Sequence, residues 1–365
     1  MKPPWAAVLA VVLVAGCQAS TSVETTAAPP SQSASASATS PTAPPSPTLP
    51  SIAECADLFE ASDGRIAFTV QEGSAAGIAT INADGSGFEL VVEPGPAREQ
   101  PHAGTVAPGW LPDGRILFTS NRAGGPDDFH LFIVDPGAGD PERLTNEPDQ
   151  IEFDGAISAD GSTLAYAVAL ATGDPAEPFR DVGIVLSDAH GGDAGQVTFP
   201  PKGTFDQWPD ISPDGTKLAF SRGMGGDPGS ALGSINVVNL DGTTSQGELT
   251  DPELDAIRPR WSPDGQWLLF SSNADNYATE SANVWVVRSN GTGLRQLTFE
   301  SGMSQAFFPD WSPDGQHIVY LHHRAGSGTQ DLSIMALDGG PGCTLWEGTS
   351  SQLAGDPDWG QAGAE

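Results

Sequence analysis

Four charged side chains occupy one repeated position in the sequence and are the first candidates for chemistry. They are Asp210, Arg260, Asp310 and Asp358, and each stands directly before a Trp or, in one copy, an Ile. We call this position the slot. In weaker copies of the repeat it holds Gly109 and Ala156. Carboxylate oxygens are ligands of hard cations such as calcium. Three carboxylates and one guanidinium that converge could therefore bind a cation. Alternatively, they could form salt bridges and accept hydrogen bonds from free backbone amides.

Signatures of catalysis are missing from the sequence. It contains no Gly-x-Ser-x-Gly elbow, no His-Glu-x-x-His pair and no Walker loop. His322 and His323 are neighbours in an expected strand, so they point to opposite faces and cannot share one metal. His102, His130 and His190 lie near expected loops and form no recognisable set. The sequence favours a protein without catalytic activity or cofactor, while loop residues could still form a hydrolase or lyase site for glycans or peptides.

The charged slot belongs to a long internal repeat. Its clearest copy, Pro309–Gly315, reads Pro-Asp-Trp-Ser-Pro-Asp-Gly and is followed by the strand-like Gln316–Leu321. The Asp-Gly pairs begin at residues 63, 113, 160, 214, 264 and 314, so the steps run from 47 to 54 residues. A regular period of this size indicates a repeat architecture.

Each period predicts four short antiparallel strands. The Pro-x-Trp stretch is the first strand and the Asp-Gly pair makes the first hairpin, because Asp-Gly supplies the positive φ angles of tight turns. A second apolar run such as Val284–Val287 and a short segment ending in Leu-Thr complete the unit. Four-stranded sheets repeated radially form a β-propeller. The strands are apolar at neighbouring positions, as blades buried on both faces require. The sequence therefore predicts an all-β, six-bladed propeller.

The two ends of the repeat region predict how the ring closes. No Pro-x-Trp-Ser segment precedes Asp63, and the missing copy stands at the other end as Asp356–Gly360. We therefore expect the C-terminal strand to complete blade one, whose other strands lie within residues 64–93. The propeller then spans residues 53–360, followed by a tail at 361–365. If the first strand of each blade is innermost, the slot residues approach the central channel.

The N-terminal residues predict export and a flexible tether. Residues 1–17 combine Lys2 with an apolar stretch, Ala6–Val14, that is too short to span a membrane. Residues 18–52 are rich in Ser, Thr, Ala and Pro and cannot bury enough apolar surface to fold. As a flexible coil they would span about 30–35 Å. A spacer without a tuned length is the alternative.

The net charge of −32 argues against nucleic-acid binding, which requires a basic patch. Three cysteines are present, at positions 17, 55 and 343. If Cys17 is modified, Cys55 and Cys343 remain in an exported chain that meets oxidising conditions. Because Cys55 precedes blade one and Cys343 lies in the last strand of blade six, we expect a disulfide between them. Two unpaired buried thiols are the alternative.

The loops predict which face binds a partner. The connections between the second and third strands are long and irregular, and those between blades carry Phe205, Arg258 and Phe307. Variable loops on a rigid scaffold often carry function, and aromatic and Arg side chains often anchor protein interfaces. We therefore expect these three residues to contact a partner on this face. The alternative is that the aromatic side chains cap the cores between blades.

Two resemblances add to this interpretation. The Pro-Asp-Trp-Ser-Pro-Asp-Gly pattern, with its later Asp-Gly-Gly and Leu-Thr, resembles the WD40-like PD40 repeat of TolB-type propellers over Asp63–Trp359. Val14–Cys17 resembles the bacterial lipobox, which implies a lipid on Cys17; an ordinary signal peptide with a stray Cys is the alternative. TolB-type proteins join such a propeller to an N-terminal α/β domain and serve a Tol–Pal envelope system, whereas here a tether replaces that domain.

Together these features predict an exported, lipid-anchored monomer. It would lie on the outer side of the cytoplasmic membrane or within the cell envelope, as a protein-binding or scaffold module for an envelope or extracellular protein. A propeller enzyme and a sensor of small ligands are the alternative functions.

Overall fold

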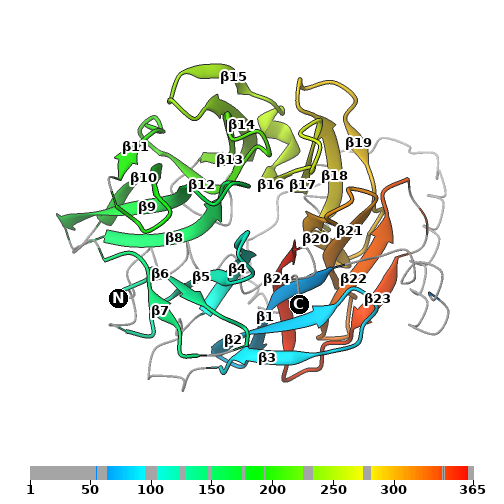
Figure 1. Ribbon diagram of the computed structural model, residues 1–365. Helices are drawn as coiled ribbons and strands as arrows, with labels where there is room; N and C mark the ends of the chain where they lie inside the picture. Colours follow the sequence, from blue (N-terminus) through cyan, green and yellow to red (C-terminus); the bar gives the residue numbers. More distant parts are fainter. Residues whose placement is uncertain are drawn as a thin grey trace, which may run out of the picture.

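The computed structural model describes Cys55 and residues 64–94, 105–123, 128–137, 139–146, 150–174, 177–192, 194–224, 233–273, 281–338, 340 and 342–360. These residues form six four-stranded antiparallel sheets set around a central axis, as Figure 1 shows. The predicted all-β, six-bladed propeller is confirmed. The predictions for residues 1–17, 18–52 and 361–365 lie outside the described residues. Among the described residues, no helix combines the length and apolar character needed to cross a bilayer.

Each blade has its inner strand at the axis. Blade one contains β24 (Leu353–Gly360), β1 (Arg65–Glu72), β2 (Ala75–Asn82) and β3 (Glu89–Val92). Blade two contains β4 (Thr105–Trp110), β5 (Ile116–Ser120), β6 (His130–Val134) and β7 (Glu142–Arg143). Blade three contains β8 (Gln150–Ile157), β9 (Thr163–Asp174), β10 (Glu177–Asp188) and β11 (Gly195–Gln196).

The other three blades follow the same order. Blade four contains β12 (Thr204–Ile211), β13 (Lys217–Met224), β14 (Gly233–Asn239) and β15 (Thr244–Glu248). Blade five contains β16 (Ala256–Trp261), β17 (Trp267–Ser272), β18 (Asn283–Arg288) and β19 (Arg295–Gln296), and the 3₁₀ helix η2 (Pro252–Leu254) precedes it. Blade six contains β20 (Gln305–Trp311), β21 (His317–His323), β22 (Gln330–Ala336) and β23 (Cys343–Trp346).

Both ends of the repeat region meet in blade one. Strand β24 pairs antiparallel with β1, so that Trp359 lies opposite Ile66. In Figure 1 the red C-terminal strand therefore lies beside the blue strand that opens the repeats. The predicted closure is confirmed. Strands from both ends of the repeat region share one sheet, so hydrogen bonds within blade one close the ring.

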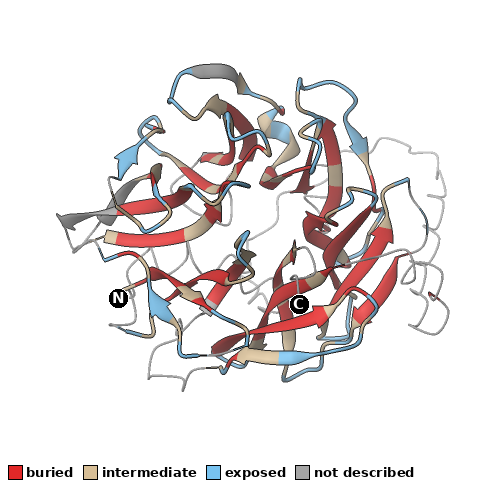
Figure 2. Cartoon of the chain, in the orientation of Figure 1, coloured by how far each residue is buried: buried red, intermediate tan, exposed pale blue. Residues whose placement is uncertain are grey.

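The core lies between the blades. Strand β5 is buried at every position, so its side chains are buried on both faces of the sheet. Figure 2 shows the inner strands buried along most of their length. Ile66 and Phe68 of blade one pack in one cluster with Val319 and Leu321 of blade six. Burying such a side chain stabilises a fold by about 1.5–3 kcal/mol. The apolar character at neighbouring positions thus reflects packing on both faces of each blade.

The Ser-Pro-Asp-Gly turn satisfies its own polar groups. In blade four, the Ser212 hydroxyl donates to Asp214 at 2.6 Å and accepts the backbone N–H of Lys217 at 2.9 Å. Gly215 has a φ of 68°, a value that favours glycine. These hydrogen bonds explain why Ser and Asp recur two residues apart in the repeat. The Asp residues of these turns are structural, as the sequence indicated.

Every inner strand carries a bulge at one repeated position. The residue there has a positive φ between 42° and 58°, and these residues are Ala107, Asp154, Trp208, Arg258, Phe308 and Asp356. The pairing register with the second strand shifts at this place, as between Ile257 and Arg260. Non-glycine residues hold such a conformation only where the surroundings impose it. The bulge therefore sets which side chains of the strand reach the axis.

One expected loop is part of a sheet. The connection from Ala169 to Asp181 was expected to be irregular, but β9 and β10 continue into it and Asp174 pairs with Glu177. Continued pairing satisfies backbone groups that a loop would leave to water. Blade three therefore has a longer hairpin than its neighbours.

Cys55 and Cys343, the pair expected from the sequence, form a disulfide with Cα atoms 6.1 Å apart. Both side chains are buried. The bond ties the segment before blade one to the outer strand of blade six, next to the place where the ring closes.

Replacing Cys343 with Ser is expected to lower the free energy of unfolding by about 2–4 kcal/mol, because the unfolded chain loses a crosslink that closes a long loop. Urea unfolding under oxidising conditions measures the change, and a Cys17→Ser variant is the control. Wild-type protein that unfolds at the same urea concentration with and without a reductant would contradict the expectation.

Candidate functional site

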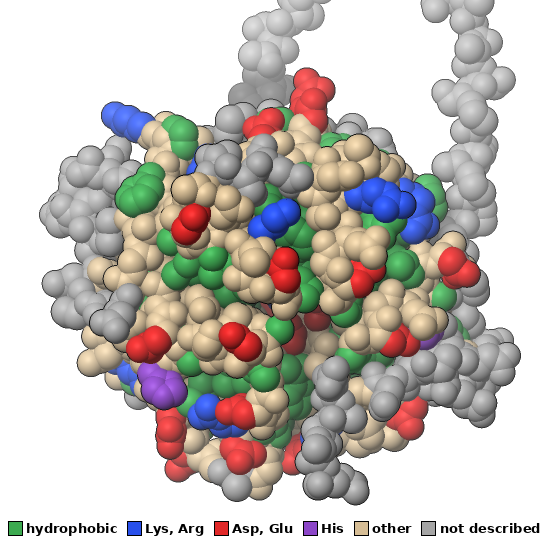
Figure 3. Space-filling model, turned by 45° about the horizontal axis from the view of Figure 1, so that its top comes forward, with side chains coloured by type: hydrophobic (Ala, Val, Ile, Leu, Met, Phe, Trp, Pro, Cys, Tyr) green, Lys and Arg blue, Asp and Glu red, His purple; other side chains and the backbone are tan. Residues whose placement is uncertain are grey.

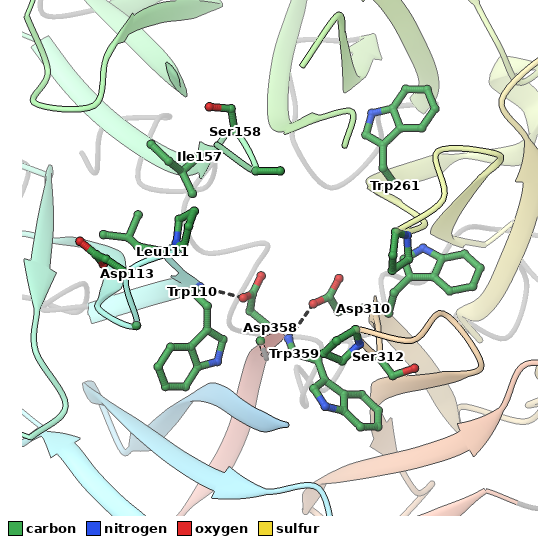
Figure 4. A pocket seen from close by; sticks show the side chains of 17 residues that line it. Trp110, Leu111, Asp113, Ile157, Ser158, Trp261, Asp310, Ser312, Asp358 and Trp359 are labelled. Atoms are coloured by element: carbon green, nitrogen blue, oxygen red, sulfur yellow. Dashed lines mark hydrogen bonds between the residues drawn. The ribbon is translucent and has the colours of Figure 1, made fainter. Parts of the chain in front are cut away.

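A cavity of about 880 Å³ opens at the end of the axis where the Asp-Gly turns lie. Its lining includes one tryptophan from each of four blades: Trp110, Trp261, Trp311 and Trp359. Figure 4 shows Trp110, Trp261 and Trp359 around the axis, with Asp310 and Asp358 between them. We call this cavity the mouth. Its volume exceeds that of two other cavities, which measure about 10 and 320 Å³.

The rim of the mouth is built from the repeated turns. Pro112, Pro263 and Pro313 line it. A Cβ atom on Gly315 would lie 3.5 Å from the Cδ of Pro263, which shows that the proline of one blade packs against the turn of the next. Proline also has a fixed φ. The rim is therefore a pre-formed edge that combines prolines with polar side chains around a hollow, and Figure 3 shows acidic side chains spaced around it.

The floor of the mouth holds the slot carboxylates, and each joins two blades. The Asp358 carboxylate accepts the backbone N–H of Trp110 at 2.8 Å, and Asp210 accepts that of Trp261 at 2.6 Å. Asp310 accepts the N–H of Trp359 at 2.7 Å, across the closure of the ring. Each acceptor belongs to the blade before its donor. The structure thus supports the alternative in which these carboxylates satisfy free backbone amides.

Arg260 lies among the same three carboxylates. Its guanidinium nitrogens are 4.0 Å from an oxygen of Asp210 and 3.9 Å from oxygens of Asp310 and Asp358. These distances are too long for direct hydrogen bonds, and the Arg260 Nε has no hydrogen-bond partner. One cation therefore faces three carboxylates that it does not fully neutralise. Within the described residues, no group of three or more His, Cys, Asp or Glu is arranged to hold a metal ion.

Burial disfavours the ionised form of these acids. It raises the pKa of Asp210 to about 6, although Arg260 and the Trp261 amide counteract it. The pKa of Asp310 is raised by burial and by the neighbouring Asp358 carboxylate, and that of Asp358 is raised by burial. The floor therefore binds protons in the folded state at a pH where the unfolded chain has released them.

We expect this excess of bound protons to make the protein less stable as the pH rises. A carboxyl whose folded pKa is raised contributes stability fully below its unfolded pKa, about 3.9, and loses it as the pH rises through the folded value. For Asp210 this window is about pH 4 to 6. The Asp210→Asn variant can still accept the Trp261 N–H, so its melting temperature should fall less than that of the wild type between pH 4 and 7. Equal falls would contradict the assignment.

A second charged layer lies deeper along the axis, at the bulges. The buried Arg258 forms an ion pair with the buried Asp356, and its guanidinium stands 4.5 Å from the centre of the Phe308 ring. Burial raises the pKa of Asp154 in the same layer to about 7. The mouth is lined by Asp310 and Asp358 but by none of these deeper residues. A space of only about 10 Å³ lies beside Asp154 and Arg258.

The expected partner-contacting residues are placed differently by the structure. Arg258 is 2% exposed and Phe307 is 9% exposed, so both side chains lie in the interior. The prediction that they contact a partner at the surface is therefore wrong. Phe205 is half-buried and packs over Gly223. The physical reason is the bulge, whose positive φ at residue 258 turns that side chain to the axis. Phe307 joins the core between blades, as the alternative interpretation held.

One buried ionic arrangement has no sequence signature. His130 lies between Glu152, 2.5 Å from its Nδ1, and Asp128, 2.7 Å from its Nε2. Burial opposes the charged imidazole, but the two carboxylates outweigh it and raise the pKa of His130. No sequence motif points to these partners of His130, because the three residues come from two blades. The buried contact between His130 and Glu152 therefore links blades two and three.

Comparison with known proteins agrees with this architecture. Residues 181–360 match the PD40 family, described as the TolB beta propeller domain. The fold is similar to TolB from Acinetobacter baumannii, with a TM-score of 0.60 and 20% identity over 81% of this chain and 66% of that chain. A TolB-type structure from Agrobacterium tumefaciens gives a TM-score of 0.55 and 22% identity over 82% and 99% of the two chains.

A curated relative matches part of the chain. The uncharacterized peptidase YuxL of Bacillus subtilis is 28% identical over 167 residues, which are 46% of this chain and 21% of YuxL. The chain thus spans about a fifth of the length of that relative. Residues 181–360 thus carry the PD40 repeats of a TolB-like β-propeller domain, and the ring as a whole has the fold of the TolB structures.

Proposed function

We propose that this protein is an exported, lipid-anchored propeller that binds a protein partner at the mouth, as a recognition or scaffold module of the cell envelope. The mouth carries the proposal: it is a pre-formed cavity of about 880 Å³ on a rigid ring. Concave, pre-formed sites of this size are where proteins take up ligands or inserted segments. The binding face is then the one formed by the Asp-Gly turns, and not the one formed by the loops between blades.

The walls of the mouth favour an inserted segment of a protein over a buried small molecule. The cavity is open to solvent along the axis, and its rim prolines lie on a face formed by repeated turns. Trp261, Trp311 and Trp359 are buried, so little of their surface is open to the cavity. A segment held by such a rim can extend over the neighbouring turns, where it gains further contacts. A monomer presents one such mouth.

Photo-crosslinking in the native host tests this function. A photo-crosslinking amino acid at Pro263, on the rim, is expected to form an adduct with one protein. The same amino acid at Phe199, which is 73% exposed on the opposite face, is the matched control and should form none. Adduct formation at Pro263 should be lost when Ala159, another rim residue, is changed to Trp. Adducts from position 199 alone would place the partner on the other face.

The anchor is a separate part of the proposal and has its own test. The resemblance of Val14–Cys17 to a lipobox supports cleavage before Cys17 and a diacylglycerol on its thiol. The Cys17→Ser variant is then expected to leave the membrane fraction, while Cys343→Ser stays there. Intact mass of the purified wild type should show both the cleavage and the lipid. Cleavage at another residue, or a Cys17→Ser protein that remains membrane-bound, would reject the anchor.

A further inference from the structure

The mouth has an unbalanced charge. The charged residues that line it are Asp113 at the rim and Asp310 and Asp358 at the floor, and no Lys or Arg is among its lining residues. Arg260 lies beneath the floor, where it also faces Asp210. Even with Arg260 counted, the three acidic groups Asp210, Asp310 and Asp358 face one guanidinium. Burial raises their pKa values, so a basic group placed beside them would favour their ionised form.

The carboxylates at the floor keep an oxygen for a further partner. Asp310 and Asp358 each use Oδ2 to accept a tryptophan N–H from the next blade. The Oδ1 atom of each is 3.9 Å from the nearest Arg260 nitrogen, beyond hydrogen-bond distance. Their side chains are 12% and 19% exposed. The blades therefore fix the position of each carboxylate while one oxygen remains able to accept a hydrogen bond from a ligand.

The turns around the mouth extend the same charge outward. The Asp of the repeated Asp-Gly pair is exposed in five blades, as Asp113, Asp160, Asp214, Asp264 and Asp314. Among these turns, Arg115 pairs with Asp113. A ring of carboxylates around a cavity with an acidic floor attracts cations over a Debye length of about 10 Å at 0.1 M salt. Charge complementarity thus points to a basic occupant.

We infer that the segment held by the mouth is basic, with a Lys or Arg side chain, or a free amino terminus, that donates to Asp310 and Asp358. This inference rests on the proposed function and names the chemistry of the partner. Apolar residues beside the basic group would contact Pro112, Pro263 and Pro313. A single ammonium group beside Asp310 and Asp358 would offset the repulsion between these two carboxyls, which adds to the effect of burial in raising the pKa of Asp310.

Short peptides of matched sequence test the inference with the full chain. The probes are Ala-Pro-Lys-Pro-Ala and its Gln and Glu analogues, acetylated and amidated, followed by calorimetry and by the fluorescence of the mouth tryptophans. We expect the Lys peptide to bind about tenfold or more tightly than the Gln peptide, and the Glu peptide to bind more weakly still. The preference for Lys should shrink as salt is raised, because the charges at the mouth are partly solvent-exposed.

Substitutions at the floor test whether its carboxylates cause the preference for the Lys peptide over the Gln peptide. Asp310→Asn and Asp358→Asn can still accept the tryptophan N–H and should remove most of the preference for Lys over Gln, with little change in affinity for the Gln peptide. Glu142→Gln removes an exposed acid on the outer strand of blade two and should leave the preference unchanged. If one Asn variant fails to fold, the other variant and the salt dependence of the wild type still show whether the floor carboxylates cause the preference for Lys. A preference retained in the Asn variants would overturn the assignment.

The outcomes separate this inference from the proposed function. If Lys and Gln peptides bind the wild type equally while Pro263 still crosslinks to a protein, the basic partner is rejected and the protein-binding mouth stands. If neither peptide binds and Pro263 forms no adduct, both are rejected. If calcium chloride alone changes the tryptophan fluorescence in an Asp310-dependent manner and displaces the Lys peptide completely, the mouth is a cation site and the inference is overturned.

Discussion

Truncation after Ala354 is expected to unfold the whole propeller rather than to fray one end. The deletion removes most of the inner strand of blade one and the side chain of Trp359, which is buried between blades. Loss of a buried Trp side chain alone costs about 3–5 kcal/mol. Loss of Asp356 leaves the buried Arg258 without its ion-pair partner, at a further cost of about 3–5 kcal/mol. Together these losses approach the total stability of a typical domain, about 5–15 kcal/mol.

Thermal unfolding followed by circular dichroism measures this effect, with amide hydrogen exchange to locate it. Protection should fall in blade six as well as in blade one, because Asp310 loses the Trp359 N–H that it accepts. A chain that lacks only residues 361–365 is the matched control and should melt like the full chain. An unchanged melting temperature after truncation at residue 354 would show that the ring does not depend on this strand.

Replacement of Arg258 with Met is expected to destabilise the protein by about 3–5 kcal/mol. The Asp356 carboxylate would remain buried, 1% exposed, without its partner, and the contact of the guanidinium with Phe308 would be lost. The double variant Arg258→Met, Asp356→Asn should recover much of this loss, because it removes the uncompensated charge. Asn suits residue 356, where φ is 42°, since it tolerates the left-handed conformation.

An exposed ion pair provides the control for this comparison. Arg115 lies 2.7 Å from Asp113, and both side chains are well exposed. Arg115→Met should therefore cost less than about 1 kcal/mol. Urea unfolding of the wild type, of Arg258→Met, of Asp356→Asn and of the double variant gives the four free energies of the cycle. Single and double variants of equal stability would mean that Arg258 contributes through packing rather than through its charge.

The local pattern of the repeat determined the fold of this chain. Ser212, Asp214 and Gly215 satisfy one another within a single turn, so their spacing alone specifies that turn. Apolar residues at consecutive strand positions require packing on both faces, and six such units have few arrangements besides a closed ring. The missing inner strand at one end and the extra copy at the other specified the closure. These features depend on residues close together in sequence, or on a simple count of repeats.

The disulfide could also be predicted from the number of repeats and the closure of the ring. Closure of the ring brings blade six next to blade one, so cysteines at the two ends of the repeats become neighbours. The sequence placed Asp210, Asp310 and Asp358 together as slot residues for the same reason. Repeated position is a reliable guide to proximity around an axis of pseudo-symmetry.

The direction of individual side chains was decided only by the tertiary structure. Arg258 reads as an exposed loop residue, but the bulge gives it a positive φ and directs it to Asp356, which is 98 residues away in sequence. Likewise, His130 meets Glu152 of another blade, and no local pattern joins them. The mouth belongs to no single repeat, because its walls and floor come from several blades. A bulge shifts the alternation of a strand by a residue, and long-range contacts in the ring determine where that shift is stable.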